Sequence, residues 1–536
     1  MFKKFFIAFL ILGIIIAGRW HYHHKKGVID ESSIIDIAII GGGISGLYTA
    51  YRLSDEHQNV AIFEASDRLG GRILTVDVPH TEGLEAEMGA MRFLASQKNV
   101  LGLLTKEFDF KIKEADLMST QLYHYLRGQK ILYTDYHEHP EKIPYQLAAN
   151  ERGKTPTELF FQTIETIVPG ASSKDSLKAL AALLQAREIV DASGKPIPLY
   201  QWDLNVLLHQ HLSGDGYQFL VDAYGFRGVF QPENAYDIIL PTFQDYAPHA
   251  MFRPVEGMTS LVTRLEDELR EHNVMIHTQH ALTGIYVVDP KAQAPIFVLA
   301  IDGQKYYARH VILTISPKAI GALDKSSILF SDPEIDNILR SAKSSIPAQK
   351  LFFVYDHPWW EEMGLSQGRV QTDLTAQQVY YWGSTPEAAM LLASYKDTPA
   401  TWQEHCDDPK AMFHNRDEVP VEVQAPQCVV DMIEAELKQI HSDPHLPMPH
   451  TVLYRDWTPL PIGGAFHRWN VGFKSWELIP KIRKPYEHLN LYITGDNYAR
   501  GTGWIEVALN SSEKLVTTHF GLERARWIPA DYDLGP

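Results

Sequence analysis

Three glycines and one acidic residue near the amino terminus have the types and spacing that bind a phosphate-linked cofactor. Gly41, Gly43 and Gly46 fall in the pattern G-x-G-x-x-G, and Glu64 follows roughly 20 residues later. In this pattern the first glycine makes a tight turn, the second lets the backbone approach a pyrophosphate, and the third packs a helix against a strand. A carboxylate at the later position accepts a hydrogen bond from a ribose hydroxyl. The four residues together predict dinucleotide binding.

The elements that must position these residues are also indicated by the sequence. The apolar run 34–40 has the composition of a buried parallel strand, and a helical pattern begins at Ile44. The start of that helix offers free N–H groups and a positive dipole end to phosphate. A second apolar strand, 60–63, ends directly before Glu64. A glycine-rich turn in another kind of α/β domain is the alternative, and the placement of Glu64 argues against it.

The segment 64–73 narrows the expected cofactor to FAD. Its sequence, EASDRLGGRI, resembles the second signature of the flavin amine oxidase family, which includes monoamine oxidases, L-amino-acid oxidases and polyamine oxidases. In that family the glycine pair, here Gly70 and Gly71, runs past the FAD pyrophosphate. The two arginines, here Arg68 and Arg72, help to hold phosphate and flavin. A basic surface turn is the alternative, and the position directly after the ribose acid favours the family.

The resemblance implies a set of FAD-binding residues spread along the chain. Monoamine oxidases carry a flavin-linking cysteine where this chain has residues 463–466, and no cysteine occurs there, so FAD should be bound non-covalently. Leu282 is expected to contact the adenine through its backbone, and Asp496 is expected to reach the ribityl chain. The full expected set is Gly41, Gly43, Ile44, Ser45, Gly46, Glu64, Ala65, Arg68, Gly70, Gly71, Arg72, Gly89, Ala90, Met91, Arg92, Leu282, Gly495, Asp496, Gly503, Trp504 and Ile505.

Two polar residues match the positions at which L-amino-acid oxidases bind the substrate carboxylate. The stretch 85–93 contains Arg92, which monoamine oxidases lack at the comparable place. A guanidinium suits this role because its fixed fork matches a carboxylate bidentately and stays charged. Tyr395 matches the second carboxylate partner, which donates a phenolic hydrogen bond. An arginine paired on a surface loop and a tyrosine buried in the core are the alternatives.

Two further residues are expected beside the flavin. Lys350 stands at the start of an apolar strand, where the family has a lysine bound through a water to the flavin N5. A cation among apolar residues costs free energy unless it is partnered, although a strand-end lysine can also reach solvent. Trp504 resembles the amino-acid oxidases and would form an aromatic wall beside the flavin. The expected catalytic set is therefore Lys350, Arg92, Tyr395 and Trp504.

The resemblance also gives a fold class and a domain layout. It implies a mixed α/β protein with a Rossmann-type FAD-binding domain, a substrate-binding domain built on a mixed sheet, and a helical insertion. Thr155 to Glu158 form a capping box that starts the insertion. The apolar stretch 274–288 is expected to add a parallel unit to the FAD domain. The expected ranges are 34–75, 254–335 and 480–525 for the FAD domain, 76–150 and 336–479 for the substrate domain, and 151–253 for the insertion.

The amino terminus differs from the rest of the chain. The apolar run 5–17 lies between basic residues and is shorter than the roughly 20 residues that span a bilayer comfortably. We expect an uncleaved membrane anchor or a signal segment at residues 1–30, and hence a membrane-anchored or exported protein of open orientation. The two cysteines, Cys406 and Cys428, permit at most one disulfide and do not fix the compartment. A formal net charge of −17 argues against nucleic-acid binding, and no Cys/His cluster has metal-ligand spacing.

The sequence therefore favours an FAD-dependent oxidase that converts an L-amino acid, water and oxygen to a 2-oxo acid, ammonia and hydrogen peroxide. The alternatives are a monoamine or polyamine oxidase, or an amino-acid monooxygenase that yields an amide. A rival of another class is a flavin-bearing membrane protein without oxidase turnover. The side-chain preference of the substrate and the oligomeric state are left open, with a homodimer as one option.

Overall fold

A seven-stranded sheet, here called the first sheet, carries the glycine-rich turn. The computed structural model describes residues 30–56, 59–115, 122–245, 250–290, 292–399 and 406–536. Five strands of the first sheet run parallel, and β13 and β14 join them as antiparallel partners. The strand order is β12 (Met275–His277), β2 (Val60–Phe63), β1 (Ile34–Ile40), β15 (Gln304–Leu313), β14 (Phe297–Ile301) and β13 (Leu282–Val287), and β23 (Leu491–Ile493) pairs with the carboxyl end of β15.

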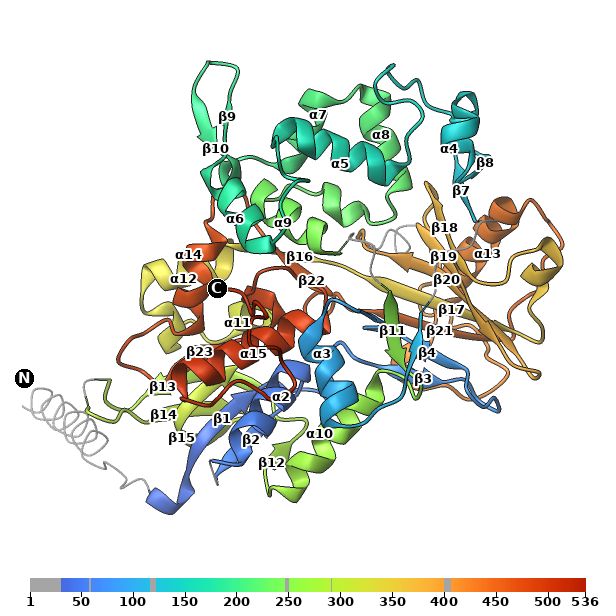
Figure 1. Cartoon of the computed structure of the whole chain (residues 1–536). Coiled ribbons are helices and arrows are strands. Elements are labelled where there is room, and N and C mark those ends of the chain that lie inside the picture. Colours follow the sequence, from blue (N-terminus) through green and yellow to red (C-terminus); the bar gives the residue numbers. More distant parts are fainter. Residues whose placement is uncertain (1–29, 57–58, 116–121, 246–249, 291, 400–405) are drawn as a thin grey trace, which may run out of the picture.

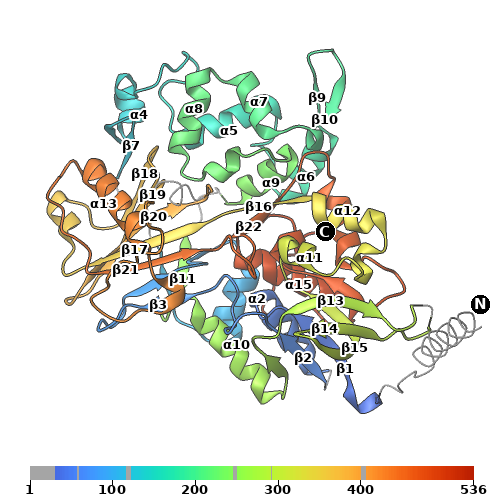
Figure 2. The same cartoon turned by 180° about the vertical axis from the view of Figure 1, so that it is seen from behind.

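Helices cover both faces of the first sheet, because alternate residues of its strands point to opposite sides. Ile37 and Ile39 pack against α2 (Ile44–Ser54), α10 (Thr259–Glu271) and α15 (Ile505–His519). Ala38 and Ile40 face the other side, with α11 (Pro317–Ala322), α12 (Pro333–Ser341) and α14 (Ser475–Arg483). Figure 1 shows this layered unit at the lower left, and Figure 2 shows it from behind. Burial on both faces explains the continuous apolar runs in the sequence.

The expectation of one parallel unit at 274–288 is wrong. The chain forms β12 at one edge of the first sheet, parallel to β2, and then crosses to form β13 at the other edge. β13 is antiparallel to β14. The turn between the two strands includes Gln279, which has a positive φ of 58°. Because apolar residues lie on both sides of this turn, the composition alone did not indicate that the segment divides into two strands.

A second seven-stranded sheet lies to the right in Figure 1. Its neighbouring strands are antiparallel except for β18 and β7. Helix α13 (Gln427–His441) packs on one face with Leu351 and Phe353, whereas Phe352 and Val354 face the opposite side. The order is β21 (Thr451–Asp456), β17 (Gln349–Tyr355), β20 (Ala389–Lys396), β19 (Gln378–Ser384), β18 (Gly368–Thr372), β7 (Tyr123–Leu126) and β8 (Gln129–Leu132).

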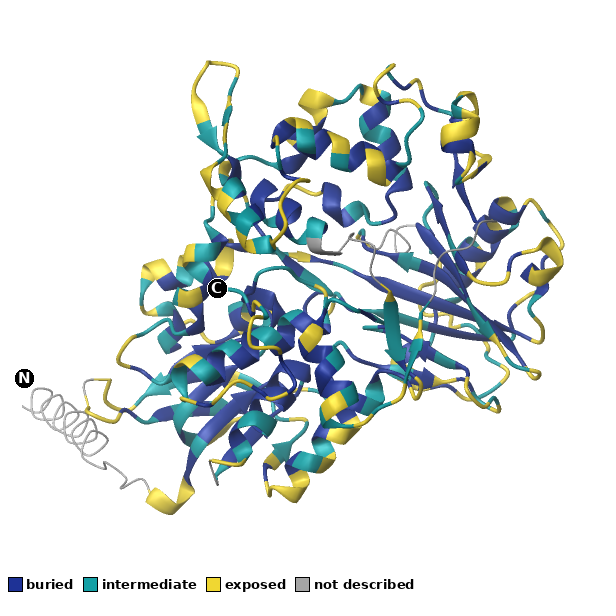
Figure 3. Ribbon diagram, in the orientation of Figure 1, coloured by how far each residue is buried: buried dark blue, intermediate teal, exposed yellow. Residues whose placement is uncertain are grey.

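The helical insertion lies at the top of Figure 1 and has its own buried core. Its first helix begins with the expected capping box, in which Thr155 and Glu158 each accept a hydrogen bond from the other's backbone N–H. The insertion contains α5 (Pro156–Ile167), α6 (Leu177–Ala186), α7 (Leu204–His211), α8 (Gly214–Ala223) and α9 (Ala235–Asp245), and a hairpin of β9 (Glu188–Val190) and β10 (Pro196–Pro198). Figure 3 shows that buried residues predominate in the interior of the two sheet-based parts and of the insertion, and that exposed residues lie on their outer elements and loops.

Smaller elements connect these parts. A disulfide joins Cys406 to Cys428 at the start of α13. The smaller elements are β3 (Thr75–Asp77) with β4 (Glu85–Glu87), β11 (Met251–Pro254) between β5 (Phe93–Leu94) and β6 (Ile112–Glu114), β16 (Lys343–Ile346) with β22 (Phe466–Trp469), and helices α3 (Lys98–Gly102) and α4 (Asp135–Glu138). The domain ranges given above remain a prediction.

Among the described residues, no helix has the length and apolar character needed to cross a membrane. The expected anchor or signal segment at 1–30 lies almost wholly outside the described residues.

Candidate active site

One cavity of about 1100 Å³ lies where the two large sheets and the helical insertion meet. It is lined by residues from the carboxyl ends of first-sheet strands, from one face of the second sheet, and from α8 and α9. Of all the residues predicted to bind cofactor or substrate, only Gly46 and Arg68 do not line it. The structure therefore brings predicted residues from segments far apart in the sequence together in one cavity.

The surroundings of the three glycines of the turn differ, and each is compatible with the role expected of it. Gly41 has a φ of +109°, and a Cβ there would lie 2.6 Å from Thr314 Oγ1. A Cβ on Gly46 would lie 2.0 Å from the carbonyl oxygen of Gly41, so this glycine lets the helix pack closely. A Cβ on Gly43 would meet only Gly71 Cα, at 3.8 Å. Gly43 is therefore not required by the packing of the protein, and its missing side chain leaves space in the cavity.

Two helix amino termini face the same cavity. Helix α2 begins after Gly43 and α15 begins after Trp504, and neither has a side-chain cap. Their first N–H groups are thus available to an anion, and the helix dipoles favour negative charge at both places. Glu64 lies beside the first of them, since its Oε2 accepts a 2.7 Å hydrogen bond from the Gly42 N–H. Ser66 donates to the other oxygen of Glu64.

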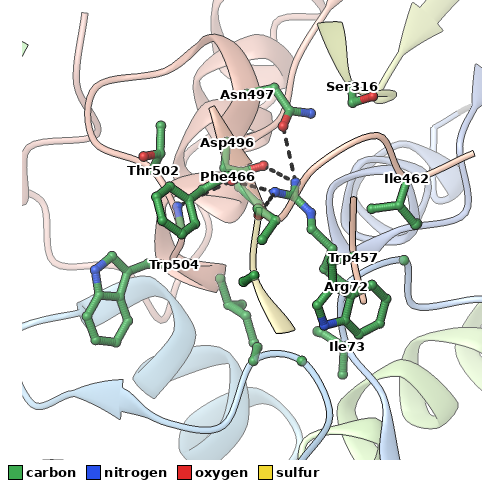
Figure 4. A pocket seen from close by; sticks show the side chains of 18 of the residues that line it. Arg72, Ile73, Ser316, Trp457, Ile462, Phe466, Asp496, Asn497, Thr502 and Trp504 are labelled. Atoms are coloured by element: carbon green, nitrogen blue, oxygen red, sulfur yellow. Dashed lines mark hydrogen bonds and ion pairs between the residues drawn. The ribbon is translucent and has the colours of Figure 1, made fainter. Parts of the chain in front are cut away.

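The two arginines of the second signature differ in what they contact. The Arg68 guanidinium turns back to its own loop, where it donates to the carbonyl oxygens of Leu69, Gly71 and Ile73 at 2.7–3.1 Å. It fixes the glycine loop and does not line the cavity, so a direct contact from Arg68 to phosphate or flavin is not supported. Arg72 does line the cavity and forms an ion pair with Asp496, as Figure 4 shows.

Lys350 is buried at the floor of the cavity, with 2% of its surface exposed. Its Nζ donates to the carbonyl oxygens of Glu87 and Gly89, at 2.8 and 2.6 Å, and to Met91 Sδ at 3.3 Å. These contacts use all three N–H groups of an ammonium, so a water at this position must share or replace one of them. Burial lowers the pKa of Lys350, and the nearby Glu87 carboxylate opposes that shift.

Pairing of the strands explains why Lys350 and Tyr395 meet. The two residues are directly opposite in the antiparallel pair of β17 and β20. Lys350 Nζ lies 4.9 Å from the centre of the Tyr395 ring. Burial raises the pKa of the Tyr395 hydroxyl, so it stays protonated and can donate a hydrogen bond.

Arg92 lies on the same side of the cavity, between β4 and β5. Its positive charge acts on both Tyr395 and Lys350. The guanidinium carbon lies 5.9 Å from the centre of the Tyr380 ring. Arg92 Nη1 is buried and has no hydrogen-bond partner among the described residues. A buried charged donor without a partner is costly, and it indicates a missing acceptor such as a bound anion.

Aromatic rings close the central part of the cavity. Figure 4 shows Trp504 and Phe466 near one another on one side, and Trp457 beside Arg72 on the other. The Trp457 indole N–H donates to the carbonyl oxygen of Met88, at 2.8 Å. Tyr224 and Phe226, from the insertion, also line the cavity. Such walls exclude water and hold an apolar or aromatic part of a ligand.

Several cavity residues were missed by the sequence analysis. Phe466 and Arg468 point to one face of β22, and Arg468 Nη1 lies 3.2 Å from the buried Glu233 carboxylate. Asp237 lines the cavity from α9. His124, on β7, is held by Tyr133 and Gln371. Because alternate residues of a strand share a face, the sequence of β22 could have indicated Phe466 and Arg468 together. The contribution of α9 could not be predicted in this way, since it depends on how the insertion packs against the two sheets.

The fold and the cavity are those of a dinucleotide-dependent oxidoreductase, in which one part of the cavity suits the cofactor and another part suits a substrate. The profile of the family described as "Flavin containing amine oxidoreductase" matches residues 44–515. The chain belongs to this family.

Individual proteins are similar to the chain at low identity. Aplysianin-A of Aplysia kurodai is 24% identical and is aligned over 98% of this chain and 99% of its own length. An L-amino-acid oxidase of Crotalus adamanteus is 23% identical over 67% of this chain and 65% of its own. The solved structure of a putrescine oxidase bound to putrescine has a TM-score of 0.65 at 17% identity, and covers 91% of this chain and 99% of its own. The last similarity supports the fold.

FAD is the cofactor of this family, and the residues present fit it. The open space at Gly43, the two uncapped helix starts and the Glu64 carboxylate suit the diphosphate and a ribose. Leu282 lies at the start of β13 and lines the same cavity. No cysteine is present at 463–466, so these residues would hold FAD without a covalent link.

Proposed function

We propose that the protein is an L-amino-acid oxidase that forms a 2-oxo acid, ammonia and hydrogen peroxide. The observation that carries the proposal is Arg92. Its half-buried side chain lines the cavity beside Tyr395 and Lys350, and its buried Nη1 lacks a partner among the described residues. A substrate carboxylate would supply that acceptor, and an amine without a carboxylate would not.

The side chains divide the work in a simple way. Arg92 and Tyr395 bind the carboxylate and thereby fix the position of the α-carbon, which is chiefly a contribution of orientation. Bound FAD would supply the hydride acceptor for that carbon. Trp504 and Phe466 exclude water and confine the amino group. The ammonium group of Lys350 lies at the floor of the cavity, where it can orient a water or stabilise negative charge.

The comparisons support this proposal without fixing the substrate. The Crotalus protein is named an L-amino-acid oxidase, and the structural neighbour is named for putrescine, a diamine. The arginine in the cavity favours the first of these. Arg92 does not determine which amino-acid side chain is accepted. That preference depends on other cavity residues, including those that the insertion contributes.

Export or anchoring at a membrane is a further part of the proposal. A disulfide between Cys406 and Cys428 is typical of an oxidising compartment. The apolar run 5–17 supplies a segment that could target or anchor the chain. Rapid alkylation of intact cells tests this. We expect both cysteines to be blocked from the reagent until reduction, and free thiols would contradict export.

The direct test is product analysis with purified holoenzyme. We expect peroxide and ammonia in equal amounts from several L-amino acids, together with the 2-oxo acid. Equal or faster turnover of amines would instead support an amine oxidase. An amide product would support a monooxygenase, and failure of every amino acid and amine to reduce the flavin would support a non-catalytic role.

A further inference from the structure

Met91 is in an unusual position for a methionine. It lines the cavity with 7% of its surface exposed, and its Sδ lies 3.3 Å from Lys350 Nζ. The other two acceptors of Lys350 are backbone carbonyls, so the thioether is the weak third partner of a buried cation. Met91 thus lines the space in which the products of the proposed reaction form.

We propose that Met91 is a modification site, oxidised to the sulfoxide by hydrogen peroxide that the enzyme itself releases into this cavity. The inference rests on the proposed function, which supplies the oxidant. Bulk peroxide reaches exposed methionines first, because susceptibility follows access. Peroxide formed inside the cavity meets Met91 before it reaches the surface. The site of oxidation therefore reports where the oxidant was made.

The chemistry balances with peroxide alone. A sulfur lone pair attacks one peroxide oxygen, the O–O bond breaks, and a new S–O bond forms. The proton of the transferred oxygen passes to the departing hydroxide, which leaves as water. Lys350 is placed to carry this proton, since its Nζ lies within hydrogen-bond distance of the sulfur. The thioether loses two electrons and the peroxide gains them.

The modification changes the surroundings of Lys350. A sulfoxide oxygen is a much stronger hydrogen-bond acceptor than a thioether, and it makes a flexible apolar side chain polar. The segment around Met91 is tightly packed, because a Cβ on Gly89 would lie 1.9 Å from the Arg72 carbonyl oxygen. An oxygen added to the sulfur would lie close to Lys350, because Sδ is 3.3 Å from its Nζ. Progressive loss of activity during turnover is the expected result.

The test uses holoenzyme turning over an L-amino acid in the presence of catalase, which removes peroxide that has left the protein. Peptide mass spectrometry then measures sulfoxide at each methionine. We expect Met91 sulfoxide to rise with the number of turnovers, while Met412 and Met448, exposed by 51% and 53%, stay at the level of resting enzyme. Reagent peroxide added to resting holoenzyme should reverse this order. Met91 unmodified after extensive peroxide release overturns the inference.

A matched pair of variants gives a second measurement. Met91→Leu removes the sulfur at similar volume, and Met88→Leu makes the same change at a buried residue that does not line the cavity. Each variant is compared with its own initial rate. Met91→Leu should lose a smaller fraction of its activity per turnover than wild type, and Met88→Leu should decay like wild type. Equal decay of all three contradicts the inference, whereas absence of peroxide from any L-amino acid refutes the proposed function itself.

Discussion

Replacement of Arg92 by alanine removes the guanidinium, including its buried Nη1, that we assign to the substrate carboxylate. The change should leave FAD binding intact, because the glycine turn, Glu64 and the two helix starts do not depend on this side chain. In the free enzyme it removes a buried donor that lacks a partner, so folding should not suffer. The loss should appear only when a carboxylate enters.

The size of the loss follows from the burial of the pair. Removal of one member of a buried, hydrogen-bonded charge pair costs about 2–5 kcal/mol, mostly because the other charge is stranded. Expressed as transition-state binding, this is a fall of roughly 30- to 4,000-fold in kcat/KM for L-amino acids. Tyr395→Phe removes one hydrogen bond to a charged group and should cost less, about 1.5–3 kcal/mol.

The assay compares each L-amino acid with the amine that lacks its carboxylate. Peroxide release gives kcat/KM for both, and the flavin absorbance checks that FAD is still bound. Arg92→Ala should depress the amino-acid rates and leave the amine rates unchanged or higher. Equal depression of both substrate classes, with FAD bound, would refute the assignment of Arg92 to the carboxylate.

Three further predictions concern the cofactor, the lysine and the pH dependence of stability. Gly43→Val should fold but fail to load FAD, since the new side chain would occupy the cavity without clashing with the protein; full loading of the variant would contradict this. Denaturation of the wild-type protein should release all its yellow colour as free FAD, and colour left on the polypeptide would contradict non-covalent binding. Lys350→Met should keep the flavin spectrum while rapid mixing shows reduction or reoxidation slowed roughly 10- to 10,000-fold, and unchanged rates in both would make the lysine structural. Burial lowers the pKa of His124 and of His441 to about 4 in the folded protein. Between pH 6.5 and 4 these histidines are therefore protonated in the unfolded chain but not in the folded one, so the free energy of unfolding should fall as the pH drops from about 6.5 to 4. The slope is up to about 1.4 kcal/mol per pH unit for each histidine, and thermal unfolding of His441→Gln should show a shallower dependence than wild type.

The parts of the site that were predictable depend on local backbone chemistry or on strand ends. The roles of Gly41 and Gly46 follow from close approaches within one strand–turn–helix unit, and the sequence pattern contains that whole unit. Lys350 and Tyr395 were recognised by resemblance, but their contact depends on the register of β17 and β20. Arg68 does not line the cavity because its side chain donates to carbonyl oxygens of its own loop, so its role in FAD binding stays a prediction.

The remaining parts depend on docking between distant segments. The ion pair of Arg468 with Glu233 joins β22 to the loop before α9, and no local pattern specifies it. The contact of Met91 with Lys350 joins two segments about 260 residues apart and arises from how β4 and β17 meet. The position of β13 across the first sheet is likewise a matter of topology, since its composition also suits a parallel strand.

The central claim is that this cavity selects an α-carboxylate, and anaerobic flavin reduction tests it without oxygen chemistry or product release. Wild-type holoenzyme is mixed in a stopped-flow instrument with an L-amino acid, or with its decarboxylated amine at the same concentration. We predict rapid bleaching of the flavin by at least one L-amino acid and much slower bleaching by its amine. Faster bleaching by amines across the panel, or none by any L-amino acid, would contradict the account.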